Sequence, residues 1–579
     1  MYAEPNNSYS GQQQILANRG IPVEDQSKWL DAWKQDIHDW RLLDNMEEAV
    51  SVIFQAALND YPTVIIQDCD VDGYTSTSIL FNFLFKVHPV FAENHITILQ
   101  HEGKQHGLSD LIDKIPEDTL LVILPDAGTN DVEQCKALRA KGIEVVVLDH
   151  HESDTDNPYA IIVNPQIGGR YPNKNLVGAG VTWQFCRAYS EVCGYGDVAW
   201  DYIDLCALGQ IGDMSDYRDL EVRAMVNLGL FNIKNKFIDA IISKNTYSFN
   251  KMNGVNYYSM AFYCVPFINA ICRSGTAEEK RLVLHALLER TQWEKIESSK
   301  RGEKGKLVPC FQEAVTVIER VKRRQTKAQD EAMDYFENQI IDNDLTQNAM
   351  IFLIDRESVV PAEIRGLIAN KIQAKYQHPT AVLSLSDDMY TGSMRNYGLS
   401  VNQDLKATLE STELAQCIGH KNAAGLFVKS MNLNKLNKAM NNIYKDIDQT
   451  PTYHIDYLWN WDTIDTEKTL EIGCLTIYGQ NIPESLICVE NVPLKKCAIT
   501  LMGVEKGHPT LKININGVDV IKFKSSQEEY EEFSNPNACL TLIGKCKKNE
   551  WQGNVSPQIL IEDFELTTQE TDWTEDWVF

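Results

Sequence analysis

The chain has 579 residues, a length typical of three or four domains. Hydrophobic residues make up 44% and charged residues 23% of it, values of ordinary globular protein that exclude wholesale disorder. Its 54 lysines and arginines face 81 aspartates and glutamates, so the net charge of −27 argues against a protein that coats nucleic acid by bulk attraction. Any polyanion must therefore be held by local basic patches or by metal ions.

Neither the apolar runs nor the cysteines indicate an exported or membrane protein. The longest apolar run, 79–91, is broken by polar residues and falls short of the ~18 residues that a membrane span needs. The first thirty residues contain no apolar stretch of the kind found in secretory signals. The 14 cysteines are scattered singly without any C-x-x-C pair, which excludes a zinc ribbon or a disulfide scaffold. We therefore expect a cytoplasmic protein with no membrane partner.

The predicted elements begin with helical segments and then change to an alternating pattern. A helix is expected within 13–21, and an amphipathic stretch with tryptophans follows at 29–43. Short β-branched runs then alternate with helical ones, at 63–67, 95–100, 119–125 and 143–149. This alternation predicts a parallel sheet with crossover helices.

The second half of the chain divides into three predicted parts. Residues 311–338 contain no glycine or proline, which favours a long helix connecting two lobes. A second α/β unit is expected over 349–446. Short alternating strands with turns over 451–566 are typical of a small β-barrel.

The strongest local signal is the sequence QDCDVDGYTS at 67–76. It places three carboxylates, Asp68, Asp70 and Asp72, directly after a predicted buried strand. Ligands of open α/β sheets collect beyond the carboxyl ends of the strands, so we favour metal binding over a solvated acidic turn. The helix that begins here could also receive a phosphate at its N-terminus.

Two further predicted strands end in potential ligands. One is followed by Asp126, and the next by Asp149, His150 and His151, while Asp213 closes an apolar helical run. Taken singly, Asp126 would be a helix N-cap and the two histidines an exposed turn. Their recurrence at neighbouring strand ends favours a shared site.

The donor set indicates which ions this site would hold. Carboxylates with one or two imidazoles and no thiolate suit Mn²⁺ or Mg²⁺ better than structural zinc. Six such groups can hold two ions that share one carboxylate, and an ion pair of this kind activates water against a phosphoryl group. Phosphoester hydrolysis is the reaction class that follows.

These motifs resemble those of a known superfamily. DCDVDGYTS, DAGTND, LDHHESD and GD at 212–213 are similar, in order and spacing, to the four motifs of the DHH phosphoesterases. Other segments resemble the RecJ-like single-strand exonucleases in particular: ILANRGI (15–21), YPNKNLVGAGV (171–181), PFINAICRSG (266–275), GSMR (392–395), GHKNAAG (419–425), YGQNIPE (478–484) and NEWQG (549–553).

The resemblance implies roles for the candidate catalytic residues. It makes Asp68, Asp70, Asp72, Asp126, His150 and Asp213 metal ligands, with Asp126 as the bridge and Asp68 as a ligand or a close partner of one. Asp149 would orient the two histidines. His151 would hydrogen-bond the scissile phosphate or protonate the leaving oxygen.

It also implies residues that hold substrate phosphates: Asn269, Arg273, Ser393, Arg395 and His420. Arginine offers a fork of donors to phosphate oxygens, although a surface salt bridge is the alternative for each. His101 stands where the family usually has an arginine, so we expect a weaker or pH-dependent contact with the terminal phosphate there. Ile418 and Lys371 are further departures, which affect end-specificity more than catalysis.

The resemblance covers nearly the whole chain and implies an α/β fold with five parts. These are an N-terminal segment plus DHH domain with a parallel sheet (1–310), a connecting helix (311–345), a DHH-associated α/β domain (346–448), an OB-fold β-barrel that binds nucleic acid (449–566) and an acidic tail (567–579). Basic clusters at 300–306 and 320–327 could guide the strand, or be solvated faces. Trp551 and Phe523 could stack on bases, although for Phe523 we favour a core position.

We therefore expect a two-metal exonuclease that degrades single-stranded DNA from 5′ to 3′ into 5′-mononucleotides, in repair, recombination or replication. The alternatives are a DHH nano-RNase or cyclic-dinucleotide phosphodiesterase, and a non-catalytic scaffold like the RecJ-related subunit of the eukaryotic replicative helicase. We expect a monomer that uses Mn²⁺ or Mg²⁺, with a single-strand-binding protein or a helicase as candidate partner. The acidic, aromatic tail is similar to the tips of bacterial single-strand-binding proteins and could compete with nucleic acid or dock on a partner.

Overall fold

The computed structural model describes residues 9–103, 105–153, 155–447 and 452–568. The chain forms two compact units, one of residues 32–452 and the other of the N-terminal residues to Asp31 together with the chain from Tyr453. The acidic tail proposed above lies, from residue 569 onward, outside the described residues. No helix among the described residues is long and apolar enough to cross a membrane.

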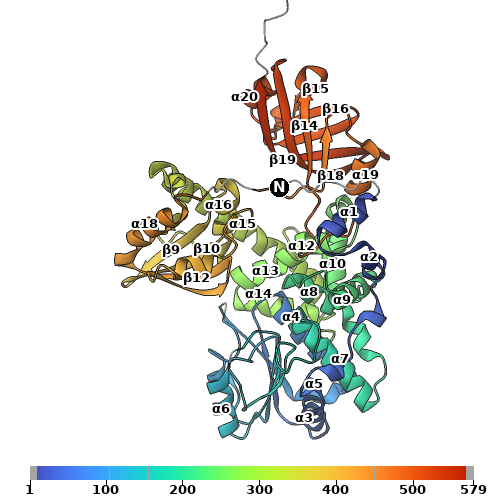
Figure 1. The fold of residues 1–579 in the computed structure, drawn as a ribbon. Helices are drawn as coiled ribbons and strands as arrows, with labels where there is room; N and C mark the ends of the chain where they lie inside the picture. Colours follow the sequence, from blue (N-terminus) through green and yellow to red (C-terminus); the bar gives the residue numbers. More distant parts are fainter. Residues whose placement is uncertain (1–8, 104, 154, 448–451, 569–579) are drawn as a thin grey trace, which may run out of the picture. The chain divides into compact units, whose positions relative to one another are not determined.

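The larger unit contains the predicted parallel sheet (Figure 1). Its five strands lie in the order β2-β1-β3-β4-β5, all parallel. They are β1 (Thr63–Gln67), β2 (Ile96–Gln100), β3 (Leu121–Pro125), β4 (Glu144–Leu148) and β5 (Ile161–Val163). The four predicted strands are confirmed within two residues at each end, whereas the short β5 was not predicted. Because the chain crosses to opposite sides of β1, the topological switch point lies between β1 and β3, where ligands of such sheets bind.

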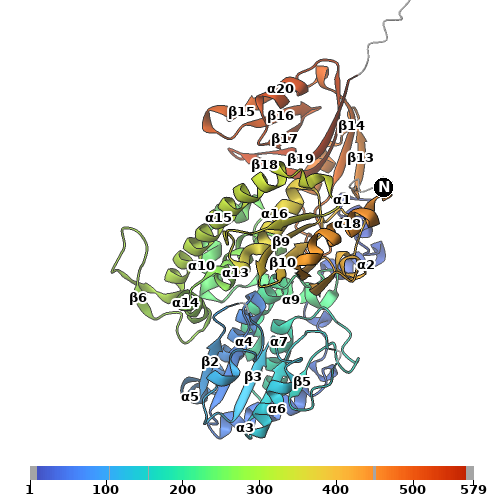
Figure 2. The ribbon, with the colours of Figure 1, turned by 90° about the vertical axis from the view of Figure 1, so that its left-hand side faces the viewer.

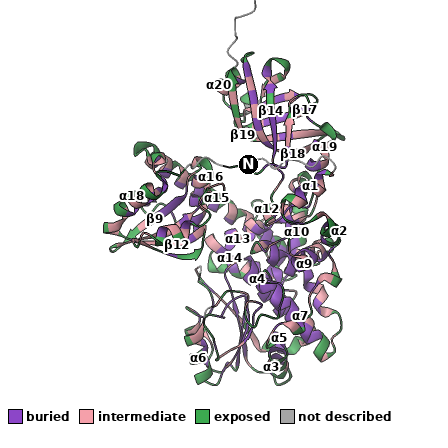
Figure 3. Ribbon diagram, viewed as in Figure 1, coloured by how far each residue is buried: buried purple, intermediate pink, exposed green. Residues whose placement is uncertain are grey.

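Helices cover both faces of this sheet (Figure 2). On one face Val64, Val122 and Val145 pack with Cys135 and Leu138. Figure 3 shows α4 and α7 as buried over much of their length, which matches the burial of all of the first fourteen residues of α4. The helices are α3 (Met46–Leu58), α4 (Val71–Val87), α5 (Pro89–Asn94), α6 (Val132–Ala140), α7 (Gly178–Cys193), α8 (Ile203–Gly212), α9 (Leu220–Phe231), α10 (Lys236–Lys244), α11 (Thr246–Lys251), α12 (Tyr257–Tyr263), α13 (Val265–Ser274) and α14 (Ala277–Leu287).

The predicted connecting helix is present as α15 (Cys310–Asp342), 33 residues long. It follows a hairpin of β6 (Lys295–Glu297) and β7 (Leu307–Pro309). Its first half buries Ala314, Ile318 and Val321, and its second half buries Phe336 and Ile340 in the core of the next α/β layer. One continuous helix is therefore shared by both parts of this unit.

The second α/β layer is a mixed sheet of order β11-β12-β10-β9-β8. Only β8 and β9 run parallel. One face packs on α15 and α16, and the other carries a separate core that includes Met394, Leu426 and Met440. The elements are β8 (Ile351–Ile354), α16 (Arg365–Tyr376), β9 (Thr380–Ser386), β10 (Met389–Arg395), α17 (Leu405–Glu410), β11 (Ala415–His420), β12 (Ala423–Lys429) and α18 (Leu433–Tyr444).

The C-terminal unit is an OB-like β domain with seven strands in the order β13-β14-β18-β19-β17-β16-β15. The expected core position of Phe523 is wrong, since this side chain is 61% exposed at the end of β17. The side chain of Trp551 lies outside what the structure describes. The elements are β13 (Tyr457–Asn460), α19 (Thr466–Gly473), β14 (Ile487–Pro493), β15 (Ala498–Met502), β16 (Thr510–Ile515), β17 (Val518–Phe523), α20 (Gln527–Phe533), β18 (Ala538–Trp551) and β19 (Asn554–Thr568).

The N-terminal helices α1 (Gly11–Asn18) and α2 (Val23–Leu30) belong to this C-terminal unit, whereas the sequence groups them with the DHH domain. The cause is a buried carboxylate, Asp456, which accepts hydrogen bonds from Arg19 at 2.8 and 2.9 Å and from Asn18 at 2.8 Å. Beyond α2 the expected helical stretch 29–43 consists of short 3₁₀ turns at 34–36 and 40–42.

Candidate metal centre

The carboxyl ends of the central strands bring the predicted ligands together. Asp68, Asp70 and Asp72 follow β1, Asp126 follows β3, and the Asp149-His150-His151 run follows β4. Asp213 joins them from the C-terminal end of α8. Within the described residues, three groups have ligand atoms lying within 4.8 Å of one another: Asp68, Asp70 and Asp126; Asp72, His150 and Asp213; and Asp126, Asp149, His150 and His151.

Asp126 lies at the centre of this cluster and has an unusual backbone. Its φ is +71°, in the left-handed region that a non-glycine residue rarely adopts. The residue is 2% exposed, and its Oδ1 is buried without a hydrogen-bond partner. Burial, and then the neighbouring charges of Asp72 and Asp70, raise its pKa well above the ordinary value. This carboxylate oxygen is buried among other acids and has no hydrogen-bond donor, and a bound cation would stabilise it.

Asp72 is held by the N-terminus of α7. Its two carboxylate oxygens accept the backbone N–H groups of Gly178 at 2.7 Å and Ala179 at 2.9 Å. Burial raises the pKa of Asp72 to about 7 despite these bonds. A Cβ at Gly178 would lie 2.4 Å from Asp126 Oδ1, and one at Gly209 would lie 2.6 Å from Asp72 Oδ1. The glycines of these helices therefore give the carboxylates the space they occupy.

His150 faces three of the acids. Its Nε2 lies 3.3 Å from Asp126 Oδ1, 3.7 Å from Asp213 Oδ2 and 3.8 Å from Asp72 Oδ2. Burial lowers the pKa of His150 to about 4, so its ring is neutral and can offer a lone pair to a metal ion. Burial and the charges of Asp72 and Asp70 raise the pKa of Asp213 to about 8.

Asp149 orients the two histidines beside it. Its Oδ1 accepts the backbone N–H groups of His150 at 2.7 Å and His151 at 3.2 Å, and its Oδ2 accepts that of Thr129 at 3.0 Å. His151 Nδ1 also pairs with Oδ1 at 2.7 Å, and this hydrogen bond raises the pKa of His151 to about 9. The second ring nitrogen of the half-exposed His151 is left for another partner.

His106 is a member of the site that sequence reasoning missed. Its Nδ1 pairs at 2.7 Å with Oδ2 of Asp68, whose side chain is 1% exposed and whose other oxygen has no partner. His106 lies in the segment after β2, the strand next to β1. The rule that identified Asp126 and His150, polar residues following neighbouring strands, could also have found it.

His101, in contrast, is not among the side chains that lie together at this site. Its side chain is fully buried and pairs with Asp110 at 2.7 Å. The loop that carries His101 is held in place by a buried lysine. The ammonium of Lys280 donates to the carbonyls of Glu102 at 2.7 Å and Gly103 at 3.0 Å. The structure therefore gives no support for the expected contact of His101 with a terminal phosphate.

The other candidate phosphate ligands come from three elements of the larger unit, α13, β10 and β11. Asn269 and Arg273 lie on α13, where the carbonyl of Cys272 accepts the thiol of Cys69 at 3.4 Å, so Arg273 adjoins the loop of the three aspartates. Arg395 and His420 are paired through the same residue of β12, Ala423. Facing residues of antiparallel strands share a face, so Ser393, Arg395 and His420 lie on one side of this sheet. Alanine and glycine between them leave that face open.

The residues fit a centre for hard divalent cations. The donors are carboxylate oxygens and a neutral imidazole, and the oxygens Asp68 Oδ1 and Asp126 Oδ1 are buried and unsatisfied. Such a set suits Mn²⁺ or Mg²⁺.

Comparisons with known proteins agree with this chemistry. The DHH family N-terminal domain matches residues 62–210, and the RecJ OB domain matches residues 455–563. The SPbeta prophage-derived protein YorK of Bacillus subtilis, named as a single-strand DNA-specific exonuclease, is 32% identical over 563 residues, which cover 95% of each chain. The chain belongs to the RecJ family of single-strand-DNA-specific exonucleases.

Other RecJ proteins extend the comparison. RecJ of Bacillus subtilis is 25% identical over 95% of this chain and 67% of its own. The crystal structure of Thermus thermophilus RecJ with Mn²⁺ shares the fold with a TM-score of 0.69 and 20% identity, covering 97% of this chain and 79% of the other. A second structure of that protein contains Mg²⁺ and has a TM-score of 0.64. The predicted fold class, the hydrolase class and the single-strand specificity are thereby confirmed.

Proposed function

We propose that this RecJ-family exonuclease holds two Mn²⁺ or Mg²⁺ ions and degrades single-stranded DNA from its 5′ end into 5′-mononucleotides. The observation that carries the proposal is the position of Asp126, which belongs both to the Asp68–Asp70 group and to the group of His150. One carboxylate shared by two ligand groups is the arrangement of a two-cation centre. When bound, such a pair of ions would supply an activated water and neutralise charge on the phosphate.

The chain's own residues divide into holding and positioning roles. Asp68, Asp70 and Asp126 would hold one ion, and Asp72, Asp126, His150 and Asp213 the other. Asp149 fixes the orientation of His151, whose second ring nitrogen can donate to a phosphate or leaving oxygen. Arg273, Ser393 and Arg395 can bind the terminal phosphate, which would set the distance from the strand end to the bond that is cut.

The direction and the product are tested with one substrate labelled at either end. With Mn²⁺ present, a 5′-labelled single strand should release its label as a mononucleotide from the earliest times, while a 3′-labelled strand shortens gradually. Early release of a 3′-labelled mononucleotide would contradict the proposed direction. Activity on dinucleotides alone would favour a nano-RNase, and no activity on any substrate would favour a scaffold.

A further inference from the structure

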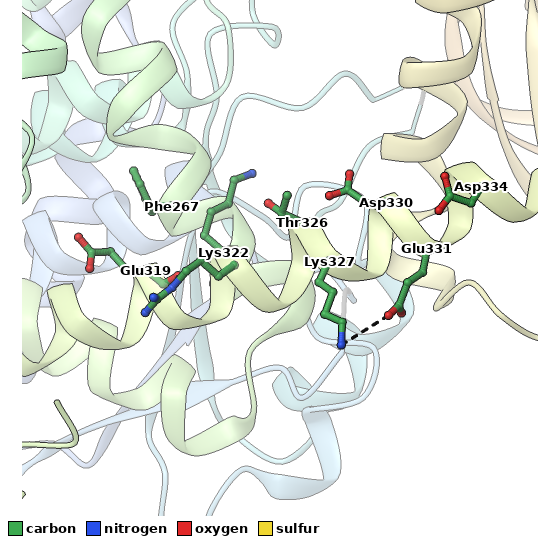
Figure 4. A pocket seen from close by; sticks show the side chains of 9 residues that line it. Phe267, Glu319, Lys322, Thr326, Lys327, Asp330, Glu331 and Asp334 are labelled. Carbon is green, nitrogen blue, oxygen red and sulfur yellow. Dashed lines mark hydrogen bonds and ion pairs between the residues drawn. The ribbon is translucent and has the colours of Figure 1, made fainter. Parts of the chain in front are cut away.

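The basic residues of the first half of α15 are mostly neutralised by acids. Arg320 and Arg324 both reach Glu279, with ion-pair distances of 3.4 and 2.8 Å. Lys327 pairs with Glu331 at 3.6 Å on the exposed side of the helix (Figure 4). Lys300 and Lys306 of the 300–306 cluster, in the hairpin before α15, pair with Glu303. Most of the two basic clusters are therefore solvated, locally compensated surfaces.

Lys322 differs from these residues. Figure 4 shows its side chain directed away from that of Lys327, on the side of α15 where Phe267 of α13 lies. Its ammonium has a weak contact of 3.5 Å with Gln325. Burial, and then the positive charges of Arg273 and Lys371, lower the pKa of Lys322 below its ordinary value. The residue is thus a half-buried cation that faces other cations.

Arg395, at the end of β10 in the second sheet, belongs to the same group of cations as Arg273 and Lys322. Its guanidinium packs over α16 at Gly366, where a Cβ would lie 2.4 Å from Nη2. Burial, and then the charge of Arg273, lower the pKa of Arg395. Among the described residues, no ion pair is formed by Arg273, Lys322 or Arg395, whereas Lys371 pairs with Asp330 at 3.3 Å.

Three cations without an ion pair thus come from α13, α15 and β10 in a protein whose net charge is −27. The first two elements touch beside Arg273, where Gln325 of α15 donates through Nε2 to the hydroxyl of Ser274 at 3.0 Å. Like charges in a partly buried site repel, and this costs folding free energy unless an anion binds between them. The group adjoins the metal centre, since Cys272, next to Arg273, contacts Cys69 between Asp68 and Asp70. A polyanion entering that centre would therefore place a phosphate within reach of these cations.

We propose that Lys322 of the connecting helix is a further substrate-binding residue, which binds the terminal phosphate of the single strand together with Arg273 and Arg395. The inference rests on the proposed function, because it assumes that the strand reaches the metal centre past α13. It assigns to α15 a direct part in substrate binding as well as its part in joining the two sheets.

The test measures binding without hydrolysis, so its result is independent of cleavage direction. The full-length protein is titrated onto a fluorescent 5′-phosphorylated oligothymidylate in EDTA, and anisotropy is followed at several salt concentrations. Three variants are compared: K322M, which keeps the apolar stem and removes the charge; K322R, which keeps the charge; and K327M, the matched control on the same helix.

K322M should weaken binding about five- to tenfold and reduce the slope of log affinity against log salt by ~0.7, the value for one phosphate contact on a single strand. K322R should stay within about twofold of the parent, and K327M should leave affinity nearly unchanged. The melting temperature of K322M without DNA should not fall, since an unpaired cation has been removed. Equal losses in K322M and K327M, or a loss in K322M that follows a lower melting temperature, would overturn the proposal.

Discussion

Asp126 combines a strained backbone conformation with a position suited to binding metal ions. Its left-handed φ of +71° positions a carboxylate between the groups that follow β1 and β4, and Gly178 leaves the space for it. Strained backbone of this kind persists where the surrounding structure holds it, and it is concentrated at functional sites. The strain and the unsatisfied oxygen both indicate a residue selected for ligand binding rather than for stability.

Replacing Asp126 should separate binding from hydrolysis. D126A should reduce Mn²⁺-dependent hydrolysis of single strands by more than about a thousandfold, because both proposed ions lose a ligand. Binding of the same strand in EDTA should be retained, since phosphates are held by other residues. The matched control is D118A, at an exposed aspartate before β3, which should keep full activity. Near-normal turnover of D126A in excess Mn²⁺ would contradict the shared-ligand role.

His106 should act through Asp68 rather than on the substrate. H106A should raise the Mn²⁺ concentration for half-maximal activity about tenfold, because partners that orient metal ligands typically contribute this much to affinity. The rate at saturating Mn²⁺ should change less. H508A, at an exposed histidine of the C-terminal unit, serves as control. An unchanged Mn²⁺ requirement combined with a raised KM for DNA would instead make His106 a substrate ligand.

At the scale of elements, α7 positions the site through its first turn. Its N–H groups at Gly178 and Ala179 fix Asp72, and the bare Cα of Gly178 faces Asp126. A helix N-terminus favours a carboxylate charge by its dipole and by its free donors.

G178A tests this positioning. The added Cβ would lie 2.4 Å from Asp126 Oδ1, so it must displace Asp126 or shift α7. We expect kcat to fall by more than about a hundredfold, and stability to fall by about 1–3 kcal/mol, the usual range for overpacking. G398A is the control, because a Cβ there meets open space. Normal kcat in G178A would show that the close approach is not required.

The end of α4 offers a test of pH dependence away from the metal centre. The Nε2 of His88 lies at hydrogen-bonding distance from the hydroxyls of Tyr189, at 2.8 Å, and Tyr195, at 3.2 Å, and burial lowers the pKa of His88. The unfolded chain then binds a proton more readily than the folded one, so stability is lost as pH falls below about 6.5. H88Q should therefore show a smaller drop in melting temperature between about pH 7.5 and about pH 5.5 than the parent. An equal drop in both would contradict this.

At the scale of the whole molecule, the sequence predicts what depends on local pattern. Buried strands such as 63–67 and the uninterrupted helix α15 have strong periodic signals, and parallel strands must bring their carboxyl ends to one edge. The convergence of Asp70, Asp126 and His150 follows from that geometry alone. The grouping of the candidate metal ligands is therefore largely predictable from the sequence.

Other features depend on contacts between distant parts of the chain. The pairing of Arg19 with Asp456 spans 437 residues, and only the folded chain shows that the N-terminal helices pack there. His101 is buried in a pair with Asp110, and the charge of Arg273 acts on Lys322 from another helix. Periodicity reveals neither of these relations. Phe523, for which we expect a core position, is exposed because it stands at the end of β17, where the pattern of the strand no longer fixes the environment of the side chain.

The most direct test of the central claim is the number of Mn²⁺ ions bound, measured by calorimetric titration of the full-length, metal-free protein and its variants. We expect two ions for the parent and loss of both tight sites in D126A, because that carboxylate is shared. D213A should lose only the site that includes His150. A single site in the parent, or one undisturbed tight site in D126A, would contradict a two-cation centre bridged by Asp126.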